Sequence, residues 1–492
     1  MELQVSIIIG VVLYELIVII GASVLIRRRE KKLLEQEGGF ALAGRSMGLA
    51  LLAPTIALTV LGAAHITGIF EMSYGMGAAA IWFSIAHVTL IVVACFGTGI
   101  WVRRLGVVTV PEAIKGMYGE RVGIAVTCTM AGAVTGVLTL ECQGLGIVIN
   151  ALTGWGIAQG VFVGGILGLL YVVLAGMKEV GAVNLVNIIV MYIGLIVAMV
   201  FIAFKLPGGN FDIVVENLHN DPEGGPFMTS IFGTPQIFIT FAVGQLLAVT
   251  FCQSISQMLM QTFMSAKNEK VIRKSVWIAA PLNGMFGVFS VCIGLAARSI
   301  PEYAANGPKS AAMSMIVDML PTGVAALLLA SLLAAILSTF AMTTLTPATM
   351  WVNDIYHHYF NPEASPKKLA NMTRILIVII GIYAMFVSTA LPTILDAIGW
   401  IFSWVIPVWF TVAFGIFWKR HPVVAGLAIG VSWFFNLVWS FTPIRDVIGG
   451  TIGALPNAYV TLIFTLLIYI IGNLIVKGEP AYRKVVEWKE VE

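Results

Sequence analysis

Two adjacent hydroxyl side chains lie in the middle of a long apolar run. Ser338 and Thr339 follow two alanines in the run Pro321–Asn353, which has 33 residues and no charged side chain. Most hydroxyls in such a run bond back to their own helix or join neighbouring helices. Sodium is a hard cation that prefers oxygen ligands, and two neighbouring hydroxyls can supply them together with carbonyls freed by a broken helix. The pair is therefore a candidate cation site.

Few ionisable side chains interrupt the apolar runs. An ionisable group at membrane depth is costly, and it is a functional candidate by default. The set comprises Glu15, His65, Glu71, His87, Glu141 and Asp396. Glu15 and His87 fit structural roles, and the positions near run ends fit a solvated role. For the two deepest, Glu141 and His65, a functional and a structural role both remain open.

Two further runs have centres that permit a helix to unwind. One is the polar segment Gln253-Ser254-Ile255-Ser256-Gln257, and the other is the small-residue segment Gly62-Ala63-Ala64. Interrupted helices in corresponding positions of two halves are typical of a transporter binding site near the membrane midplane. Close helix packing through small residues is the competing explanation.

The composition determines which elements can position these residues. Only 11% of the 492 residues are charged, 59% are hydrophobic, and the mean hydropathy is +0.95. A water-soluble fold cannot bury that much apolar surface, and the same numbers exclude disorder and a disulfide-rich secreted scaffold. The five cysteines all lie in apolar runs without a CxxC pair, so we interpret them as small buried hydrophobes. No hydrolase, metalloprotease, P-loop or dinucleotide-binding signature occurs, so the sequence does not predict an enzyme.

Thirteen apolar runs are long enough to cross about 30 Å of hydrocarbon as helices. The runs are Leu3–Ile26, Met47–Phe70, Gly77–Trp101, Val122–Asn150, Gly156–Gly176, Val180–Phe204, Gln236–Met264, Val276–Ala297, Pro321–Asn353, Ile375–Leu391, Ala397–Trp418, Pro422–Phe441 and Asn457–Val476. We therefore expect an all-α polytopic membrane protein.

The basic residues predict how these spans are oriented. A basic cluster follows the first run and none precedes it, which is typical of an uncleaved anchor with its N-terminus outside. In that orientation, 24 of the 28 Lys and Arg residues fall on the inner side. The positive-inside rule therefore favours a multi-pass protein of the cell membrane with a cytoplasmic C-terminus. The basic residues then face cytosol and lipid headgroups, and we expect no nucleic-acid partner.

Short motifs along the chain resemble those of one transporter family. They are FALAGRSM at 40–47, YGMG at 74–77, TVPE at 109–112, LTG at 152–154, AKN at 266–268, AAILST at 334–339, DIY at 354–356 and FWKR at 417–420. Together and in this order they resemble the sodium:solute symporter family, which includes sodium–proline, sodium–pantothenate, sodium–sialic acid and sodium–glucose carriers.

The resemblance implies a leucine-transporter-type fold with two inverted five-helix repeats. On this chain it divides the residues into an N-terminal extra helix with a basic inner loop (1–39), a first repeat (40–205), an outer loop (206–235), a second repeat (236–418), two C-terminal transmembrane helices (419–477) and a cytoplasmic tail (478–492).

The resemblance also implies two sets of binding residues. The family's sodium site falls on the backbone carbonyls of Leu58, Leu61 and Ala335 and on the hydroxyls of Ser338 and Thr339. The expected solute-binding residues are His65, Thr67, Glu141, Gln253, Ser256 and Gln257. Glu141 departs from the family pattern, because relatives are usually uncharged there. Glu141 is therefore expected either to balance the charge of a cationic solute or to carry a proton.

The expected function is sodium-coupled symport of a small polar organic solute, such as an amino acid, organic acid, vitamin or sugar, into the cell by alternating access. Sodium is co-transported, no bond is made or broken, and the partners are the solute and the lipid bilayer, with no obligatory protein partner. Two alternatives remain, namely a proton-coupled carrier of the same fold that uses Glu141 or His65, and a solute sensor without transport.

Overall fold

The computed structural model describes residues 13–14, 17–18, 21, 42–174, 177–390 and 394–486. Most of the first predicted span lies outside these residues, as do Glu15 and the side chain of Asp396. Helices dominate the described residues, which contain two isolated bridges and no β-strand. The structure confirms the predicted all-α class.

The first half of the chain begins with an interrupted helix and continues with long helices. In order these are α3 (Leu49–Thr59), α4 (Ala63–Met76), α5 (Ile81–Val93), α6 (Ile100–Arg104), α7 (Val110–Tyr118), α8 (Glu120–Thr153), α9 (Ile157–Leu174) and α10 (Met177–Lys205). Gly77 turns the chain after α4 with φ +69°, and a Cβ there would lie 2.3 Å from the carbonyl oxygen of Met228. Only glycine fits this turn.

The second half repeats the pattern, with an interrupted helix followed by long helices. In order these are α12 (Pro235–Ile237), α13 (Gly244–Gln253), α14 (Gln257–Met264), α15 (Glu269–Ser299), α18 (Thr322–Met350), α19 (Pro366–Ser388), α20 (Ile394–Ser403), α21 (Ile406–Phe417), α22 (Pro422–Phe441) and α25 (Asn457–Ile475). The short helices α11 (Asp212–Asn220), α16 (Pro301–Ala304) and α17 (Ala311–Met319) lie in connecting loops. Every predicted span from Met47 onward coincides with a helix or an interrupted helix of the structure.

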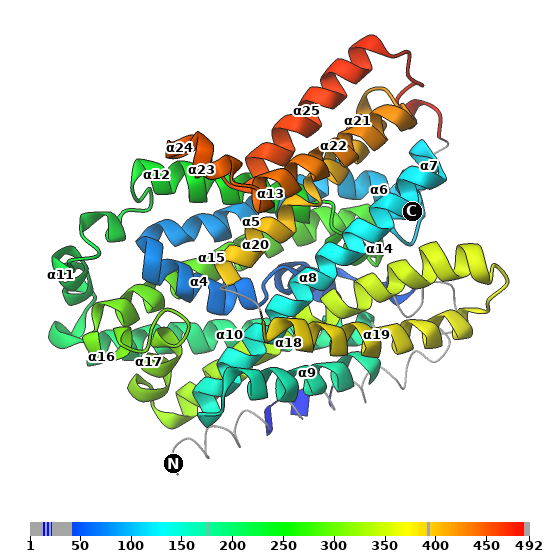
Figure 1. Cartoon of the computed structure of the whole chain (residues 1–492). Helices are drawn as coiled ribbons and strands as arrows, with labels where there is room; N and C mark the ends of the chain where they lie inside the picture. The colour runs from blue at the N-terminus through cyan, green and yellow to red at the C-terminus, as the bar shows by residue number, and fades with distance from the viewer. Residues whose placement is uncertain are drawn as a thin grey trace.

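Helix α18 forms the centre of the bundle and the C-terminal helices lie at its edge (Figure 1). The most apolar window of the α18 crossing is 83% buried, whereas that of α25 is 28% buried. Helix α18 packs against α8, α10 and α19, and α22 packs against α25. The hydroxyl pair of α18 is thus held in the protein interior, away from lipid.

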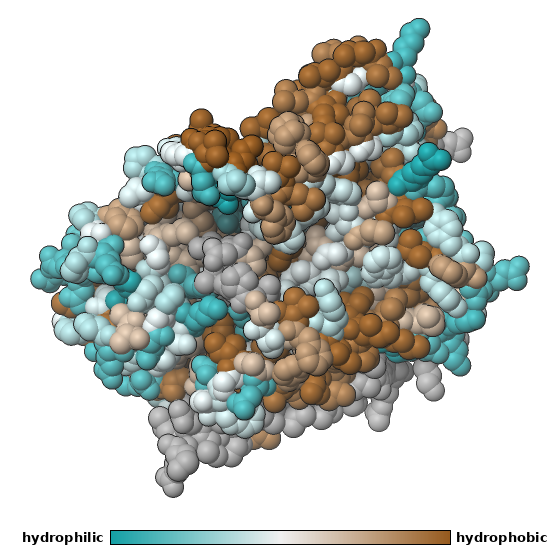
Figure 2. All heavy atoms as spheres, viewed as in Figure 1, coloured by the Kyte–Doolittle hydropathy of each residue, from teal (hydrophilic) through white to brown (hydrophobic). Residues whose placement is uncertain are grey.

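Polar residues gather at two opposite ends of the molecule, with apolar surface between them (Figure 2). One end carries α11, α16 and α17 and is called the α11 end, and the opposite end carries α7 and is called the α7 end. Large apolar side chains of the long helices are exposed, such as Phe204 of α10 at 75%, Phe441 of α22 at 73% and Ile475 of α25 at 77%. A lipid bilayer would cover this surface, and ten helices in the described part of the chain are long and apolar enough to span it. The chain is a multi-pass membrane protein.

Candidate functional site

The crossing formed by α3 and α4 is interrupted at residues 60–62, inside the protein. Val60 leaves the helical region with φ −110° and ψ 12°, and Gly62 is extended with φ −105° and ψ −156°. Helix ends leave carbonyls of the last turn and N–H groups of the first turn without intrahelical partners. The break therefore presents carbonyl oxygens from α3 and amide hydrogens from α4 at the same place.

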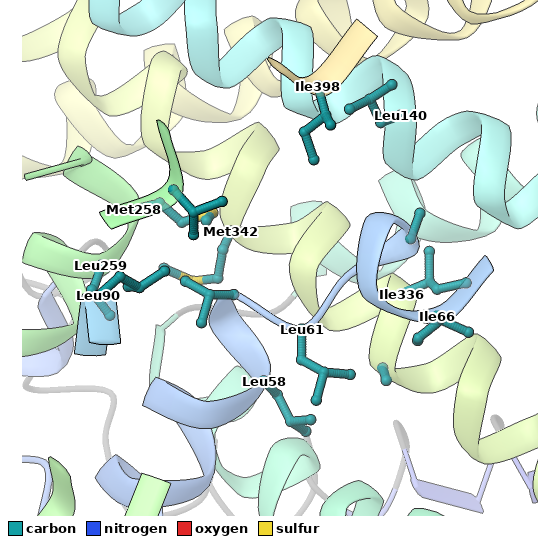
Figure 3. Close-up of a cluster of buried hydrophobic side chains, with 14 of the residues drawn as sticks. Leu58, Leu61, Ile66, Leu90, Leu140, Met258, Leu259, Ile336, Met342 and Ile398 are labelled. Carbon is teal, nitrogen blue, oxygen red and sulfur yellow. The ribbon is translucent and has the colours of Figure 1, made fainter. Parts of the chain in front are cut away.

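A hydroxyl of α18 contacts the carbonyl side of this break. The Oγ1 hydroxyl of Thr339 donates a hydrogen bond to the Leu58 carbonyl oxygen at 2.9 Å. The same Oγ1 atom lies 3.4 Å from the carbonyl oxygen of Ala335. Leu61 lies within the interruption and donates its N–H to the same Leu58 carbonyl. Figure 3 shows Leu58 and Leu61 on α3 and on the unwound link that follows it. The structure brings Thr339 and the Leu58 carbonyl together across the helix break, beside the Ala335 carbonyl, whereas Leu61 makes its contact through its N–H and not through the predicted carbonyl.

The neighbouring hydroxyl, that of Ser338, is fully buried and has no hydrogen-bond partner among the described residues. A buried polar group without a partner costs about 1–3 kcal/mol. Since it is adjacent to Thr339 on α18, a cation bound there would supply the missing partner. Hydroxyls and carbonyls without a carboxylate suit a monovalent cation, so the donor set fits sodium.

The amide side of the same break is in contact with a carboxylate. Glu141 of α8 is 2% exposed and accepts a hydrogen bond from the backbone N–H of Ala63 at 2.8 Å. A Cβ on Gly62 would lie 2.2 Å from its Oε1 atom. Glu141 therefore caps the start of α4 from another helix, because the N-cap residue Gly62 has no side chain to do so.

His65 faces a different side of α4. Its Nδ1 lies 3.0 Å from the carbonyl oxygen of Val60, and its ring packs against Phe83 and His87 of α5. Thr67 donates to the carbonyl of Ala63 and lies on the side of α4 that contacts α8. Of the two candidates on α4, Thr67 is thus on the Glu141 side, whereas His65 hydrogen-bonds a carbonyl freed by the break.

The second interruption lies between α13 and α14, at residues 254–256, and its main hydrogen bonds are made within the same turn. The backbone N–H and the hydroxyl of Ser256 both donate to the carbonyl of Gln253, at 3.1 and 3.0 Å. Thr98 also donates to the Ser254 carbonyl at 3.2 Å. The hydroxyl of Ser256 is a predicted solute ligand, and in the structure it hydrogen-bonds to a carbonyl of its own turn.

Gln257 at the start of α14 binds protein backbone with both ends of its amide. Its Oε1 accepts from the N–H of Val110 at 2.7 Å, and its Nε2 donates to the carbonyl of Val108 at 3.0 Å. Val110 is the first residue of α7, so its N–H has no partner within that helix. These bonds attach α14 to the loop before α7, which differs from the solute contact predicted for Gln257.

A small cavity of about 20 Å³, room for about one water molecule, lies beside the second interruption. Its lining comes from α8, from the α13–α14 interruption and from the α20 region, and comprises Met130, Ala133, Val134, Val137, Cys252, Gln253, Ser256, Met258, Ile401, Phe402 and Val405. Glu141 lies one turn beyond Val137 on the same face of α8. A larger groove of about 590 Å³ between α8 and α22 lies at the α7 end, away from both interruptions.

The model of the sodium:solute symporter family matches residues 40–430. The chain belongs to this family. Its members and their structural relatives are transporters and not enzymes. The family supports sodium-coupled symport for this chain, and the geometry of α18 at the first interruption is consistent with it.

Individual relatives of this symporter are distant in sequence. An uncharacterized symporter of Escherichia coli K12, YidK, is 24% identical over 80% of this chain and 72% of its own length. The sodium/glucose cotransporter of Vibrio parahaemolyticus is 23% identical over 93% of this chain and 88% of its own length. The structure of a sodium-coupled sialic acid symporter in a substrate-bound outward-open state matches with a TM-score of 0.80 and 15% identity, over 97% of this chain and 99% of that chain. This likeness shows that the symporter has the leucine-transporter-type fold.

The α7 end of the symporter is closed by bonds between segments that are far apart in the sequence. Met47, before α3, exchanges backbone hydrogen bonds with the segment after α14, through Ser265 and Lys267. The buried guanidinium of Arg103 donates to the carbonyls of Met264 and Lys267. The start of α3 and the end of α14 are thus tied to each other and to α6 at the α7 end.

Asp354 belongs to the same closure and is absent from the predicted site residues. It accepts hydrogen bonds from Thr109, the N-cap of α7, at 2.6 Å and from Thr127 of α8 at 3.4 Å. One sequence signal is its place in the DIY motif after the long α18 run. A second signal is that Asp354 directly follows a charge-free run of 33 residues, where an acidic side chain is a functional candidate.

Proposed function

We propose that this symporter couples sodium entry to uptake of a small polar organic solute by alternating access. The observation that carries the proposal is the contact between Thr339 of α18 and the Leu58 carbonyl at the first interruption, next to the unpartnered hydroxyl of Ser338. Sodium bound between these groups would hold α18 against the interrupted helix, and the bound ion would stabilise the conformation in which they meet. The solute would bind at the neighbouring cavity lined by Gln253, which must widen to hold it.

We assign the α7 end to the cytoplasm, from the positive-inside rule applied to the whole sequence. The N-terminus is then outside and the C-terminus inside. The bonds of Met47, Arg103, Gln257 and Asp354 close that end, so the arrangement is a cytoplasm-closed state. We retain residues 40–205 and 236–418 as the two inverted repeats, which would move against each other when these bonds open.

Uptake into proteoliposomes tests the coupling. The purified full chain is screened with radiolabelled amino acids, organic acids, vitamins, sugars and amines, under an inward sodium gradient and under equal sodium on both sides. We expect at least one solute to accumulate only with the gradient, and uptake to be abolished by collapsing it. Accumulation driven by a pH gradient in sodium-free buffer would contradict sodium coupling.

The proton-coupled alternative has a specific observation behind it, namely the buried carboxylate of Glu141 at the first interruption. It predicts uptake driven by a pH gradient without sodium, and loss of that uptake in Glu141→Gln. The sensor alternative predicts solute binding, seen as a shift in thermal stability, without flux under either gradient. The same preparation therefore separates all three functions.

A further inference from the structure

The start of α4 already holds a carboxylate of the protein where an anionic solute group could bind. In an interrupted membrane helix, free N–H groups at the start of a half-helix form a ready site for a carboxylate. In this chain the N–H of Ala63 already donates to Glu141 at 2.8 Å, and the carboxylate fills the space beside Gly62. A solute carboxylate would have to displace Glu141 and would meet its negative charge.

The negative charge of Glu141 has little compensation from the protein. A helix N-terminus offers about half of an elementary positive charge. No Lys or Arg lines the neighbouring cavity, as far as the described side chains show, and the buried Arg103 is engaged at the α7 end. The ring of His65 packs against α5, and its Nδ1 lies 3.0 Å from the carbonyl oxygen of Val60 in the interruption. A buried carboxyl group with so little compensation either takes up a proton or pairs with a cation, and a cationic solute would supply that pairing.

The position of Glu141 places this charge next to the proposed solute cavity. Val134 and Val137 line the cavity, and Glu141 follows on the same face of α8, one turn closer to the first interruption. The cavity walls are mostly apolar, and their polar side chains are the neutral Gln253 and Ser256. Widened from its volume of about 20 Å³, a cavity with these walls would suit the apolar body of a small amine, with its charge directed towards Glu141.

We propose that the solute of this symporter is an organic cation, a primary to quaternary amine without a free carboxylate at its charged end, and that Glu141 is its counter-charge. The inference rests on the proposed function and narrows it to one substrate class. Glu141 is then a binding residue, and its capping of α4 keeps the carboxylate in place between transport cycles.

A charge-selective labelling experiment tests the inference even while the solute itself is unidentified. Cys252 lines the cavity, and replacing Cys95, Cys128, Cys142 and Cys292 with Ala leaves it as the single thiol of the full chain. Its labelling rate is measured with a trimethylammonium-ethyl thiosulfonate and with a sulfonatoethyl thiosulfonate, each normalised to its rate with a small free thiol. We expect the cationic reagent to be favoured by about tenfold, as for a unit charge acting over several ångströms of protein.

Two variants assign that preference to a residue. Glu141→Gln should bring the normalised ratio close to one, whereas Glu120→Gln, which removes a carboxylate at the far end of the same helix, should leave it unchanged. A ratio near one in the parent chain, or an equal ratio in parent and Glu141→Gln, overturns the inference. Absence of labelling by both reagents, with and without sodium, overturns the transport proposal itself, since a solute must reach this cavity.

The proteoliposome screen gives the second readout. A sodium-driven amine whose uptake falls at least tenfold in Glu141→Gln supports the inference. A sodium-driven solute that is neutral or anionic overturns the inference and leaves sodium coupling intact, so the two proposals fail separately.

Discussion

The two interrupted helices of this symporter complete their hydrogen bonds in different ways. At the α3–α4 interruption Leu61 and His65 make local bonds, and the freed backbone groups also bond to other helices, through Thr339 of α18 and Glu141 of α8. At the α13–α14 interruption the Gln253 carbonyl bonds to the backbone and hydroxyl of Ser256 within the same turn. The first interruption therefore depends on its surroundings and the second is largely self-sufficient.

This difference indicates that the two interruptions have different roles. An interruption whose groups are bonded by side chains from α8 and α18 can respond when an ion or a solute changes those side chains. The second interruption keeps its shape and positions Gln257, whose amide holds the segment before α7. We infer that the first interruption binds ligand, and that the second links the closure of the α7 end to the cavity.

The largest effect is expected from Gly62→Ala at the first interruption. The new Cβ would lie 2.2 Å from Oε1 and 2.6 Å from Cδ of Glu141, so the carboxylate or the backbone must move. We expect about 3 kcal/mol of destabilisation and a loss of sodium-driven uptake. Thermal unfolding of the purified protein and proteoliposome uptake measure the two effects.

A second substitution tests whether the contact with Glu141 causes the destabilisation of Gly62→Ala. Glu141→Ala added to Gly62→Ala should restore part of the thermal stability, because it removes the atoms that the Cβ meets. Gly132→Ala on α8 is the matched control, since no atom lies within 4 Å of a Cβ there. A double variant no more stable than Gly62→Ala would show that the first interruption does not depend on Glu141.

A smaller effect is expected from Gln257→Leu at the second interruption. It removes two hydrogen bonds to the segment before α7 and leaves the Val108 carbonyl and the Val110 N–H without partners, at a cost of about 2 kcal/mol. Amide hydrogen exchange at residues 108–118 should become faster, because the α7 end opens more often. Gln253→Leu, four residues earlier, should leave exchange in this segment unchanged. Equal exchange in Gln257→Leu and the parent chain would contradict the proposed closure.

The smallest effect is expected from Ser256→Ala. The hydroxyl bond to the Gln253 carbonyl is lost, but the backbone N–H of residue 256 still donates to the same carbonyl. We expect at most about 1 kcal/mol of destabilisation and uptake within about twofold of the parent. A loss as large as that of Gly62→Ala would mean that the second interruption is not self-sufficient and that Ser256 binds ligand.

The fold was predictable because long apolar runs leave a chain few alternatives. Each run from Met47 onward became a helix or an interrupted helix, and the polar centre at 253–257 contains the interruption at 254–256. The small-residue centre at 62–64 overlaps the interruption at 60–62 only at Gly62, because Ala63 and Ala64 begin α4. The placement of His65 and Thr67 on different sides of α4 was also predictable, since residues two apart on a helix point in different directions. The family resemblance nevertheless implies one solute site for both.

The partners of Gln257 and Asp354 were not predictable from one sequence. Gln257 bonds to the segment before α7, and Asp354 bonds to Thr109 and Thr127, across more than a hundred residues of chain. Such contacts depend on how helices are arranged in space, and neither composition nor periodicity contains that information. The polar centre at 253–257 indicated where an interruption occurs, but it did not indicate what its side chains bind.

The central claim is that sodium binds between the first interruption and α18, and equilibrium binding of radioactive sodium to the purified protein tests it most directly. We predict saturable binding that Ser338→Ala combined with Thr339→Ala weakens by at least about tenfold, because two oxygen ligands are lost. Thr349→Ala should bind like the parent chain, since the Thr349 hydroxyl bonds to the Leu345 carbonyl of its own helix at 2.8 Å. Unchanged sodium affinity in the Ser338 and Thr339 double variant would contradict the account.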